Sequence, residues 1–216
     1  MRTIVFVNGL VQNKNALAQF VKDGDYLIGA DGGTLHCLDI GRIPDVVVGD
    51  LDSLSPAVRQ ELTDKNVRFE LHEPEKNETD LELAIKRAIA DGATSIVLAG
   101  ALGGRLDQML ANLFLLAQRD WGVSICVVDG KQRAQLVRPQ QPLVLHGTPG
   151  TTISAMPLSE RVTGITYHGL KYPLTDATLE FGSTRGISNE VLESPAKIEI
   201  KTGTLLIIWF RNKPTP

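Results

Sequence analysis

The sequence has little of what marks several large classes of protein. Only two cysteines are present, Cys37 and Cys126, and they lie far apart and outside any CxxC or Cys/His cluster. Neither a disulfide framework nor a structural zinc site is therefore indicated. Positive charge is not in excess either, because 22 lysines and arginines stand against 25 aspartates and glutamates. Without a basic surface to neutralise phosphates, we expect no nucleic-acid partner.

Long hydrophobic runs are also missing. The N-terminal stretch MRTIVFVNGL has a basic residue and then an apolar run, but Asn8 ends that run early. No stretch reaches the roughly 18 apolar residues that a membrane span needs, and no signal peptide is recognisable. We therefore expect a soluble, cytoplasmic protein with no membrane partner. Its 216 residues, 43% of them hydrophobic, can form one large domain or two small ones.

The first part of the chain has the pattern of an α/β domain. From residue 3 to about residue 130, short apolar runs alternate with segments of helical period, which predicts a mainly parallel sheet flanked by helices. The runs expected to be strands are TIVFVN, YLIGAD, DVVVGD, VRFEL, SIVLAG and VSICVVD. Apolar residues at helical spacing, from Leu81 to Ile89 and from Leu106 to Ala117, predict two helices that each lie on a core.

The pattern changes after the stretch RPQQPLVLHGTPG. Helical periodicity disappears, and short apolar segments separated by Gly, Pro, Asn and Ser predict an all-β domain, a sandwich or a barrel. The segments expected to be strands are TTISAM, ATLEF, KIEIK and TLLIIWF. The prolines of the stretch place the junction near residues 138–150. We therefore predict an α/β domain over residues 1–138 and a β domain over residues 139–216.

Two aspartates follow a buried strand in the stretch VVVGDLDSL. In extended backbone residues i and i+2 point the same way, so Asp50 and Asp52 can face one side while Leu51 anchors the turn. They follow the carboxyl end of a strand, where open α/β sheets bind ligands. Ser55 and Pro56 already suit the start of the next helix. A magnesium ion would hold two such carboxylates together, whereas the alternative is a local Asx-turn.

A third carboxylate begins the helix in EKNETDLELAI. Thr79 and Glu82 form a possible capping box, which leaves Asp80 free. Asp80 either joins the metal site or only compensates the helix dipole, an effect of about 0.3–1 kcal/mol. Lys76 is either a solvated lysine or a contact for a phosphate oxygen.

Glycine-rich turns end two further strands. In LAGALGGRLDQ, Gly103 and Gly104 precede a helix whose free N–H groups could bind an anion. Arg105 suits phosphate oxygens, although a salt bridge with Asp107 is the alternative. Neither a P-loop nor a GxGxxG fingerprint occurs. The second turn, a candidate ligand site or a simple tight turn, comprises Asp31, Gly32 and Gly33.

The motifs ADGG, GDLDS, EKNETDLELA, GGRLDQ and TRGISNE, in this order, resemble the thiamine pyrophosphokinase family over about residues 26–210. The resemblance implies an ATP:thiamine diphosphotransferase, which moves a pyrophosphoryl group from ATP to the hydroxyethyl group of thiamine, giving thiamine diphosphate and AMP. It also implies a nucleotide-binding and metal-binding α/β catalytic domain, a thiamine-binding β-sandwich domain, and a homodimer with sites at the subunit interface.

The resemblance also assigns residues to roles. The residues implied in magnesium binding and catalysis are Asp50, Asp52 and Asp80, with Arg105 and Asp107 as further catalytic residues. The residues implied in the ATP pocket are Asp31, Gly32, Gly33, Lys76, Thr79, Gly104 and Arg105. Those implied on the thiamine side are Asp107, Ser188 and Asn189. Asp107 would either orient thiamine or accept its hydroxyl proton, and Ser188 and Asn189 could instead only satisfy the backbone of their own loop.

Two departures from the family and three alternative functions remain. Asn77 stands where the family often has an acidic residue, and Gln108 where it often has a histidine. An aspartyl phosphatase with Asp50 as nucleophile, a nucleotide-sugar transferase with a DxD metal site, or a non-catalytic nucleotide sensor could use part of the same motif set. The histidines and tryptophans are not expected to take part in catalysis. Structural or solvated roles are expected for His36, His72, His146 and His168, and packing roles for Trp121 and Trp209.

Overall fold

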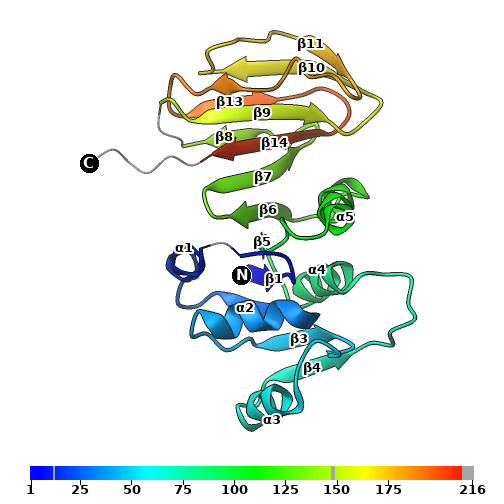
Figure 1. Ribbon diagram of the computed structural model, residues 1–216. Helices are drawn as coiled ribbons and strands as arrows, with labels where there is room; N and C mark the ends of the chain where they lie inside the picture. Colours follow the sequence, from blue (N-terminus) through cyan, green and yellow to red (C-terminus); the bar gives the residue numbers. More distant parts are fainter. Residues whose placement is uncertain (12, 147–148, 211–216) are drawn as a thin grey trace. The chain divides into compact units, whose positions relative to one another are not determined.

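The computed structural model describes residues 1–11, 13–146 and 149–210, and the chain divides into two compact units, Met1–Gly130 and Lys131–Pro216. The strands of the first unit, which are labelled in Figure 1 except for β2, are β1 (Arg2–Phe6), β2 (Tyr26–Ala30), β3 (Val46–Gly49), β4 (Arg68–Leu71), β5 (Ser95–Ala99) and β6 (Ser124–Asp129). Five of these strands fall within predicted runs and β1 begins one residue before its run, so the six predictions are confirmed.

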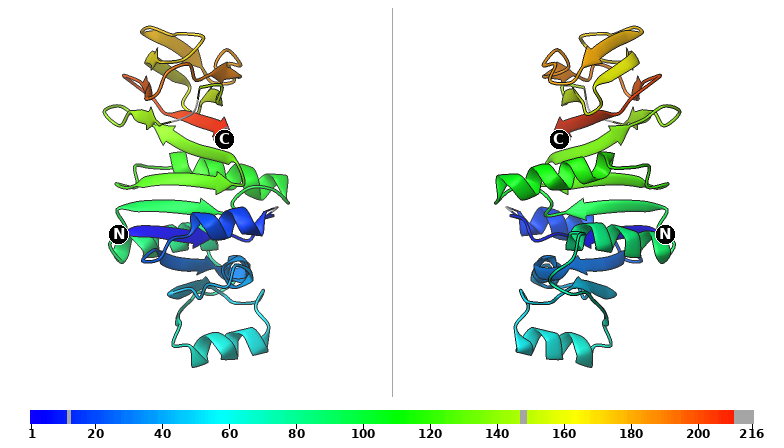
Figure 2. Two further views of the ribbon diagram at one scale, coloured as in Figure 1. Left: turned by 90° about the vertical axis from the view of Figure 1, so that its left-hand side faces the viewer. Right: turned by 90° about the vertical axis from the view of Figure 1, so that its right-hand side faces the viewer.

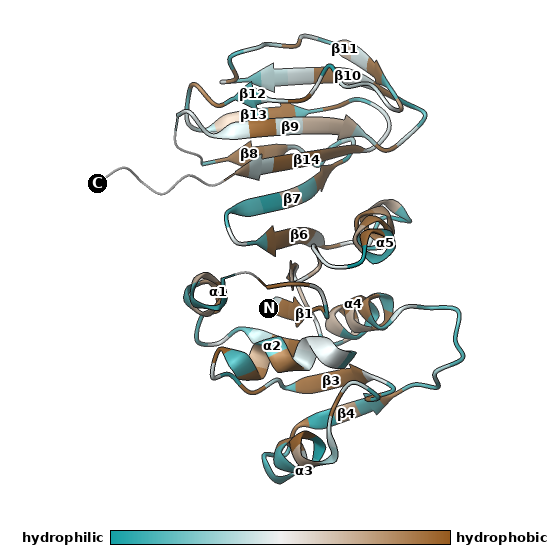
Figure 3. Cartoon of the chain, in the orientation of Figure 1, coloured by the Kyte–Doolittle hydropathy of each residue, from teal (hydrophilic) through white to brown (hydrophobic). Residues whose placement is uncertain are grey.

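These strands form a parallel sheet in the order β6-β5-β1-β2-β3-β4. The chain proceeds outward from β1 through β2, β3 and β4, and then returns to β5 on the other side of β1. The order therefore reverses between β1 and β5, and open sheets bind ligands beyond the carboxyl ends of the strands at such a point. β3, hydrophobic along its length in Figure 3, is fully buried, as expected for an inner strand of a parallel sheet that helices cover. The edge strand β4 is half-buried to exposed.

The helices of this unit are η1 (Asp31–Gly33), a 3₁₀ turn, and α1 (Lys14–Phe20), α2 (Thr34–Asp39), α3 (Pro56–Asp64), α4 (Asp80–Ala90) and α5 (Leu106–Ala117). Figure 2 shows α1 on one face of the sheet and α5 on the other. Leu17 of α1 and Cys37 of α2 belong to one hydrophobic cluster with Ile4 and Phe6 of β1. Across the described ranges, no helix is long and apolar enough to cross a membrane.

The two helices predicted from periodicity differ in burial. In α4, the apolar residues Leu81, Ala84, Ile85 and Ala88 are buried as predicted. In α5 the prediction of a stripe lying on a core is wrong, because the single buried residue of this helix, Leu116, is not part of that stripe. The stripe residues are Leu106, Met109, Leu110, Leu113, Phe114 and Ala117. The exposed fractions within the stripe are 65% for Leu106, 41% for Leu110 and 52% for Phe114. Periodicity shows that a helix has an apolar face but not whether the same chain covers it.

The second unit is a β-sandwich. Its strands are β7 (Gln132–Val137), β8 (Leu143–Leu145), β9 (Thr152–Pro157), β10 (Arg161–His168), β11 (Ala177–Glu180), β12 (Asn189–Glu190), β13 (Ala196–Glu199) and β14 (Leu205–Phe210). They form two antiparallel layers, ordered β12-β9-β14-β7 and β11-β10-β13-β8. Ile153 and Leu205 from one layer share a hydrophobic cluster with Ile165 and Ile198 from the other. This shared core confirms the predicted all-β fold.

The four β segments predicted from the sequence correspond to β9, β11, β13 and β14. The compact units meet between Gly130 and Lys131, so β7 belongs to the second unit. A functional boundary between residues 138 and 139 stays a prediction.

Candidate functional site

Asp50 and Asp52 lie in the turn that follows β3. Between them Leu51 has a φ of 64°, in the left-handed region that leucine rarely adopts, while its side chain is buried in a hydrophobic cluster. Burial of its side chain confirms that Leu51 anchors the turn, whereas its left-handed φ shows that the backbone here is not extended, contrary to the expectation from the sequence. The backbone N–H of Asp52 donates to Oδ1 of Asp50 at 3.1 Å, so the Asx-turn considered from the sequence also forms.

Three carboxylates meet at this place. Oxygen atoms of Asp31, Asp50 and Asp52, which we call the acidic cluster, lie within 4.8 Å of one another. Asp31 comes from the end of β2 and has a φ of 44°. Its Oδ1 atom is buried and has no hydrogen-bond partner among the described residues. Like charges this close repel unless a cation or a proton compensates them, so the arrangement has the chemistry of a metal site.

Asp80 lies next to the acidic cluster but outside it. A Cβ atom on Gly49, whose φ is 144°, would lie 3.1 Å from Asp31 Cβ and 3.2 Å from Asp80 Oδ1. Only glycine therefore allows β3 to end between these two aspartates. Asp80 Oδ1 is 2.9 Å from Nζ of Lys76, whose side chain is only 16% exposed. Lys76 is thus paired and largely buried rather than solvated.

The start of α4 leaves Asp80 without a capping role. Oγ1 of Thr79 accepts the N–H of Glu82 at 3.2 Å, which confirms the N-cap. In a capping box the carboxylate of Glu82 would accept the backbone N–H of Thr79. It lies instead 3.0 Å from Nζ of Lys86 and forms an ion pair with it. At α3, the predicted N-cap Ser55 and first helical residue Pro56 are confirmed as well.

A cavity of about 670 Å³ opens at the carboxyl ends of β1 and β5, the point where the strand order reverses. Residues 7–10 after β1 and several of residues 101–105 after β5 line it. Its volume lies in the range of roughly 300–1,000 Å³ that is common for small-molecule sites. Of the predicted site residues, those in its lining are Asp31, Thr79, Asp80, Gly104 and Arg105. Asp31 therefore belongs to both the cavity and the acidic cluster.

The glycines of the two turns considered as ligand sites have different surroundings. Gly103 and Gly104 have φ values of 80° and 75°, and they turn the chain into α5, where no side chain caps the helix. The free N–H groups of this helix start suit an anion. Gly32 and Gly33 instead allow close packing on the end of β1, because a Cβ on Gly33 would lie 2.1 Å from the carbonyl oxygen of Phe6.

Arg105 and Asp107 form the salt bridge considered as an alternative. Nη2 of Arg105 lies 2.6 Å from Oδ2 of Asp107, and Nε donates to Oδ1 at 3.2 Å. Their side chains are 71% and 65% exposed. The hydrogen bond from Arg105 lowers the pKa of Asp107 below its ordinary value. A carboxylate with a lowered pKa is a weaker proton acceptor.

Several residues of this site were not predicted from the sequence. Oγ of Ser53 donates to Oδ2 of Asp31 at 2.5 Å and lies 3.1 Å from Oδ1 of Asp52. His36 lines the cavity, and its Nε2 is 2.7 Å from the carbonyl oxygen of Gly9. Ser53 belongs to the GDLDS motif, but its contact with Asp31 joins two strand ends that no local pattern connects. The departure Gln108 also lines the cavity.

The predicted thiamine-side residues lie in the second unit. Asn189 is buried, its Oδ1 accepts the backbone N–H of Tyr172 at 3.0 Å, and its Nδ2 donates to the Tyr172 carbonyl at 2.8 Å. The side chain thus fixes the backbone of another segment at Tyr172, and its Oδ1 also accepts the N–H of the adjacent Glu190 at 2.8 Å, the kind of local contact considered from the sequence. Ser188 is exposed, and its N–H donates to Oγ of Ser154 at 3.1 Å. Contact of either residue with thiamine stays a prediction.

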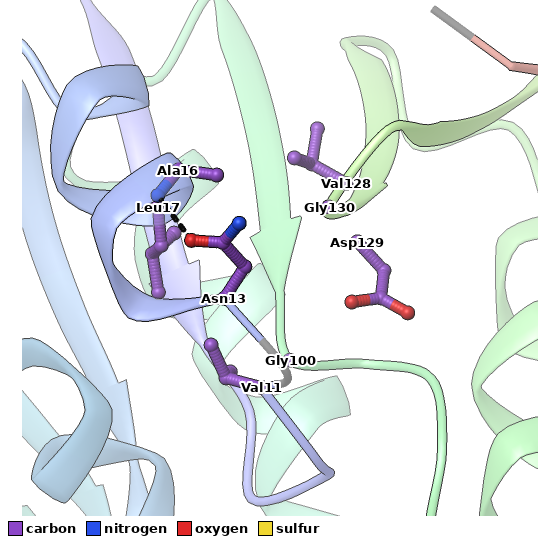
Figure 4. A pocket seen from close by; sticks show the side chains of 8 residues that line it. All are labelled: Val11, Asn13, Ala16, Leu17, Gly100, Val128, Asp129 and Gly130. Carbon is purple, nitrogen blue, oxygen red and sulfur yellow. Dashed lines mark hydrogen bonds between the residues drawn. The ribbon is translucent and has the colours of Figure 1, made fainter.

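Two smaller cavities do not compete with this site. One, of about 10 Å³, is shown in Figure 4 and lies beside the N-cap of α1, where Oδ1 of Asn13 accepts the N–H of Ala16 at 2.9 Å. It can hold about one water molecule. The other, of about 370 Å³, lies beside Trp121. Trp121 is 8% exposed and Trp209 packs against the core of the second unit, which confirms the packing roles predicted for both.

Comparison with known proteins gives matches over nearly the whole chain. The family described as thiamin pyrophosphokinase, catalytic domain, matches residues 17–127, and that described as thiamin pyrophosphokinase, vitamin B1 binding domain, matches residues 139–207. A thiamine pyrophosphokinase of Bacillus subtilis is 31% identical over 96% of this chain and 98% of its own.

Solved structures give the same result. A crystal structure of thiamine pyrophosphokinase from Bacillus subtilis superposes with a TM-score of 0.87 at 28% identity, covering 99% of this chain and all of the other. The Geobacillus thermodenitrificans enzyme gives 0.84 at 29% identity over 99% of both chains. The yeast enzyme, at 16% identity and a TM-score of 0.79 over 97% of this chain and 86% of its own, shares the fold.

Proposed function

Because the chain belongs to the thiamin pyrophosphokinase family, we propose that the acidic cluster and the large cavity of its first unit form one metal-binding and ATP-binding centre. The activity is transfer of a pyrophosphoryl group from ATP to thiamine, so ATP and thiamine are the substrates. The phosphatase, sugar transferase and nucleotide sensor considered above are not supported, since the relatives described are thiamine pyrophosphokinases. The observation that carries the proposal is that Asp31 belongs to both the cavity and the cluster.

The acidic cluster fits magnesium. Magnesium prefers carboxylate oxygens and is usually held by one or two of them together with substrate phosphates. Asp50 and Asp52 meet this requirement, and Asp31 adds a buried oxygen with no hydrogen-bond partner in the described chain. Asp80, across Gly49 from Asp31, is the proposed further ligand. When bound, magnesium would neutralise charge on the ATP phosphates and hold them in place.

In the proposed mechanism the protein aligns the substrates and balances charge. The phosphates lie in the cavity, facing the free N–H groups at the start of α5 and the guanidinium of Arg105. In this proposal Nζ of Lys76, which lies 2.9 Å from Oδ1 of Asp80, binds a phosphate oxygen when ATP is present. The thiamine hydroxyl oxygen bonds to the β-phosphorus while the bond to the oxygen bridging the α-phosphate breaks. AMP leaves, and the hydroxyl proton passes to a carboxylate or water. Such transfer needs mainly positioning and electrostatics.

We assign Asp107 an orienting role for thiamine. Its pairing with Arg105 lowers its pKa, and it does not line the cavity in this structure. Both observations favour a charged hydrogen-bond acceptor over a general base. In the proposed thiamine-binding domain, residues 139–216 of the second unit, Ser188 offers an exposed hydroxyl, and Asn189 acts by fixing the backbone of Tyr172.

We also propose a homodimer in which α5 lies at the interface. Leu106, Leu110 and Phe114 are spaced by four residues, so they share one helix face, and all three are exposed. An exposed apolar face of this kind is typical of a protein contact. Phe114→Glu should then convert a dimer of the 23.5 kDa chain to a monomer in sedimentation velocity. The exposed Gln60→Glu on α3 is the control; a wild type that is already monomeric would contradict the dimer.

The direct test of the proposed centre is a product assay. The purified protein is incubated with ATP, Mg²⁺ and thiamine, and nucleotides and thiamine esters are separated by chromatography. Thiamine diphosphate should appear in step with AMP, and EDTA should abolish both. ADP together with thiamine monophosphate would contradict pyrophosphoryl transfer. Turnover that persists in EDTA would contradict the metal. The cytoplasmic location, which fits the use of ATP, is checked by cell fractionation.

A further inference from the structure

We propose that Arg59, a residue of α3 outside the five motifs, is a positioning residue that fixes the turn carrying Asp52. This role rests on the proposed metal centre. Leu51, Asp52, Ser53 and Leu54 form a β-turn, because the N–H of Leu54 donates to the carbonyl oxygen of Leu51 at 3.0 Å. Asp52 and Ser53 occupy its two central positions. The geometry of the turn therefore decides where the Asp52 carboxylate lies.

One guanidinium holds both ends of this turn. Nε of Arg59 donates to the carbonyl oxygen of Leu54 at 2.9 Å, and Nη2 donates to the carbonyl oxygen of Leu51. The Leu51 carbonyl thus accepts two hydrogen bonds, one from the turn and one from Arg59. The planar fork of arginine can reach two such acceptors at once, which the single ammonium group of lysine cannot do with the same geometry.

The turn needs such support for two reasons. Leu51 adopts a left-handed conformation, which is unfavourable for a residue with a Cβ atom because that atom approaches the following carbonyl oxygen. The carboxylates of the acidic cluster also repel one another whenever no cation lies between them. Burial of the Leu51 and Leu54 side chains, 6% and 2% exposed, anchors the apolar side of the turn. Arg59 anchors its polar side through the hydrogen bonds to these two main-chain oxygens.

The test compares Arg59→Ala and Arg59→Lys with Gln60→Ala, a control on the same helix whose amide donates to Asp64 on the surface. Hydrogen–deuterium exchange is followed in a peptide covering residues 50–55, and Mn²⁺ affinity is measured by titration monitored by electron paramagnetic resonance. In Arg59→Ala we expect faster exchange in this peptide, unchanged exchange in β5, and Mn²⁺ affinity lower by about 10- to 100-fold, as for other residues that orient metal ligands. Arg59→Lys should lie in between.

The outcomes separate the role of Arg59 from the proposed metal centre. If Arg59→Ala shows unchanged exchange in residues 50–55, or binds Mn²⁺ as tightly as wild type, Arg59 is not a positioning residue. A general loss of stability with wild-type Mn²⁺ affinity would equally exclude a positioning role. If Arg59→Ala does not fold, Arg59→Lys decides by the same two measurements. If wild type and Asp52→Asn bind Mn²⁺ equally, the metal centre itself is wrong, whatever the exchange data show.

Discussion

The two ends of the parallel sheet use carboxylates in opposite ways. At the amino ends of the strands, Asp91 is paired with Arg87 and Arg68 and accepts the hydroxyl of Tyr26 at 2.8 Å. At the carboxyl ends, Asp31, Asp50 and Asp52 lie together, and none of them forms an ion pair with another described residue. Aspartates therefore stabilise the fold at the amino ends of the strands and, in our proposal, bind a cation at the carboxyl ends.

The electrostatics at the amino end support this contrast. Burial alone would raise the pKa of Asp91, but the hydrogen bonds from Arg87, Tyr26 and Arg68 outweigh it and lower the pKa below its ordinary value. Burial, together with the hydrogen bond to Asp91, raises the pKa of Tyr26 to about 12. Each group thus stabilises the protonation state that the other requires. A fully paired cluster of this kind suits a structural role, whereas neighbouring carboxylates without ion-pair partners suit a functional one.

The largest expected effect is that of Asp52→Asn on turnover. Loss of one carboxylate from the acidic cluster should weaken charge compensation in the transition state and lower kcat by on the order of 10²–10³-fold. The midpoint of thermal unfolding should stay the same or rise, because a repulsive charge has been removed. Product formation and calorimetry measure the two quantities, and a variant with near-normal turnover would show that Asp52 holds no metal.

Asp91→Asn should give the converse result. It leaves two arginines without their carboxylate and should lower the free energy of unfolding by about 1–3 kcal/mol, while kcat changes less than about twofold. Because the pKa of Asp91 is lowered on folding, its contribution is present above the unfolded pKa of about 3.9 and is lost as pH falls through the folded pKa. Urea unfolding of wild type and variant should therefore differ at pH 7 and converge at low pH; a constant difference would contradict the assignment.

The smallest effect is expected for Asp107→Asn, which separates two roles for a carboxylate at the carboxyl end. Its pair with Arg105 is exposed to solvent, so the unfolding midpoint should not change. If Asp107 orients thiamine, kcat/KM for thiamine should fall while the pH profile of kcat keeps its shape. Disappearance of the acidic limb of that profile would instead identify Asp107 as the base.

Much of the fold could be predicted from the sequence, because its signals are local. Every apolar run expected to be a strand in the first unit is one, and the caps at Ser55 and Thr79 are where the residue types indicate. The exposure of the α5 stripe was not predictable, since periodicity does not tell which molecule covers an apolar face.

The candidate site was predictable only in part, for a similar reason. Asp50 and Asp52 are close in the sequence and follow one predicted strand, so their proximity could be predicted from the pattern of that strand. The proximity of Asp31 depends on β2 and β3 pairing in parallel, and that of Arg59 depends on α3 folding back on the turn. Contacts of this kind join segments whose spacing in the sequence carries no periodic signal.

The most direct test of the metal assignment is an anomalous diffraction map. Crystals of the protein would be grown with MnCl₂ and a non-hydrolysable ATP analogue, and data collected at the manganese absorption edge. We expect a peak between the carboxylates of Asp31, Asp50 and Asp52, beside the analogue's phosphates in the adjoining cavity. Phosphates bound there with no manganese peak among these carboxylates, or a peak at another site alone, would contradict the proposed metal centre.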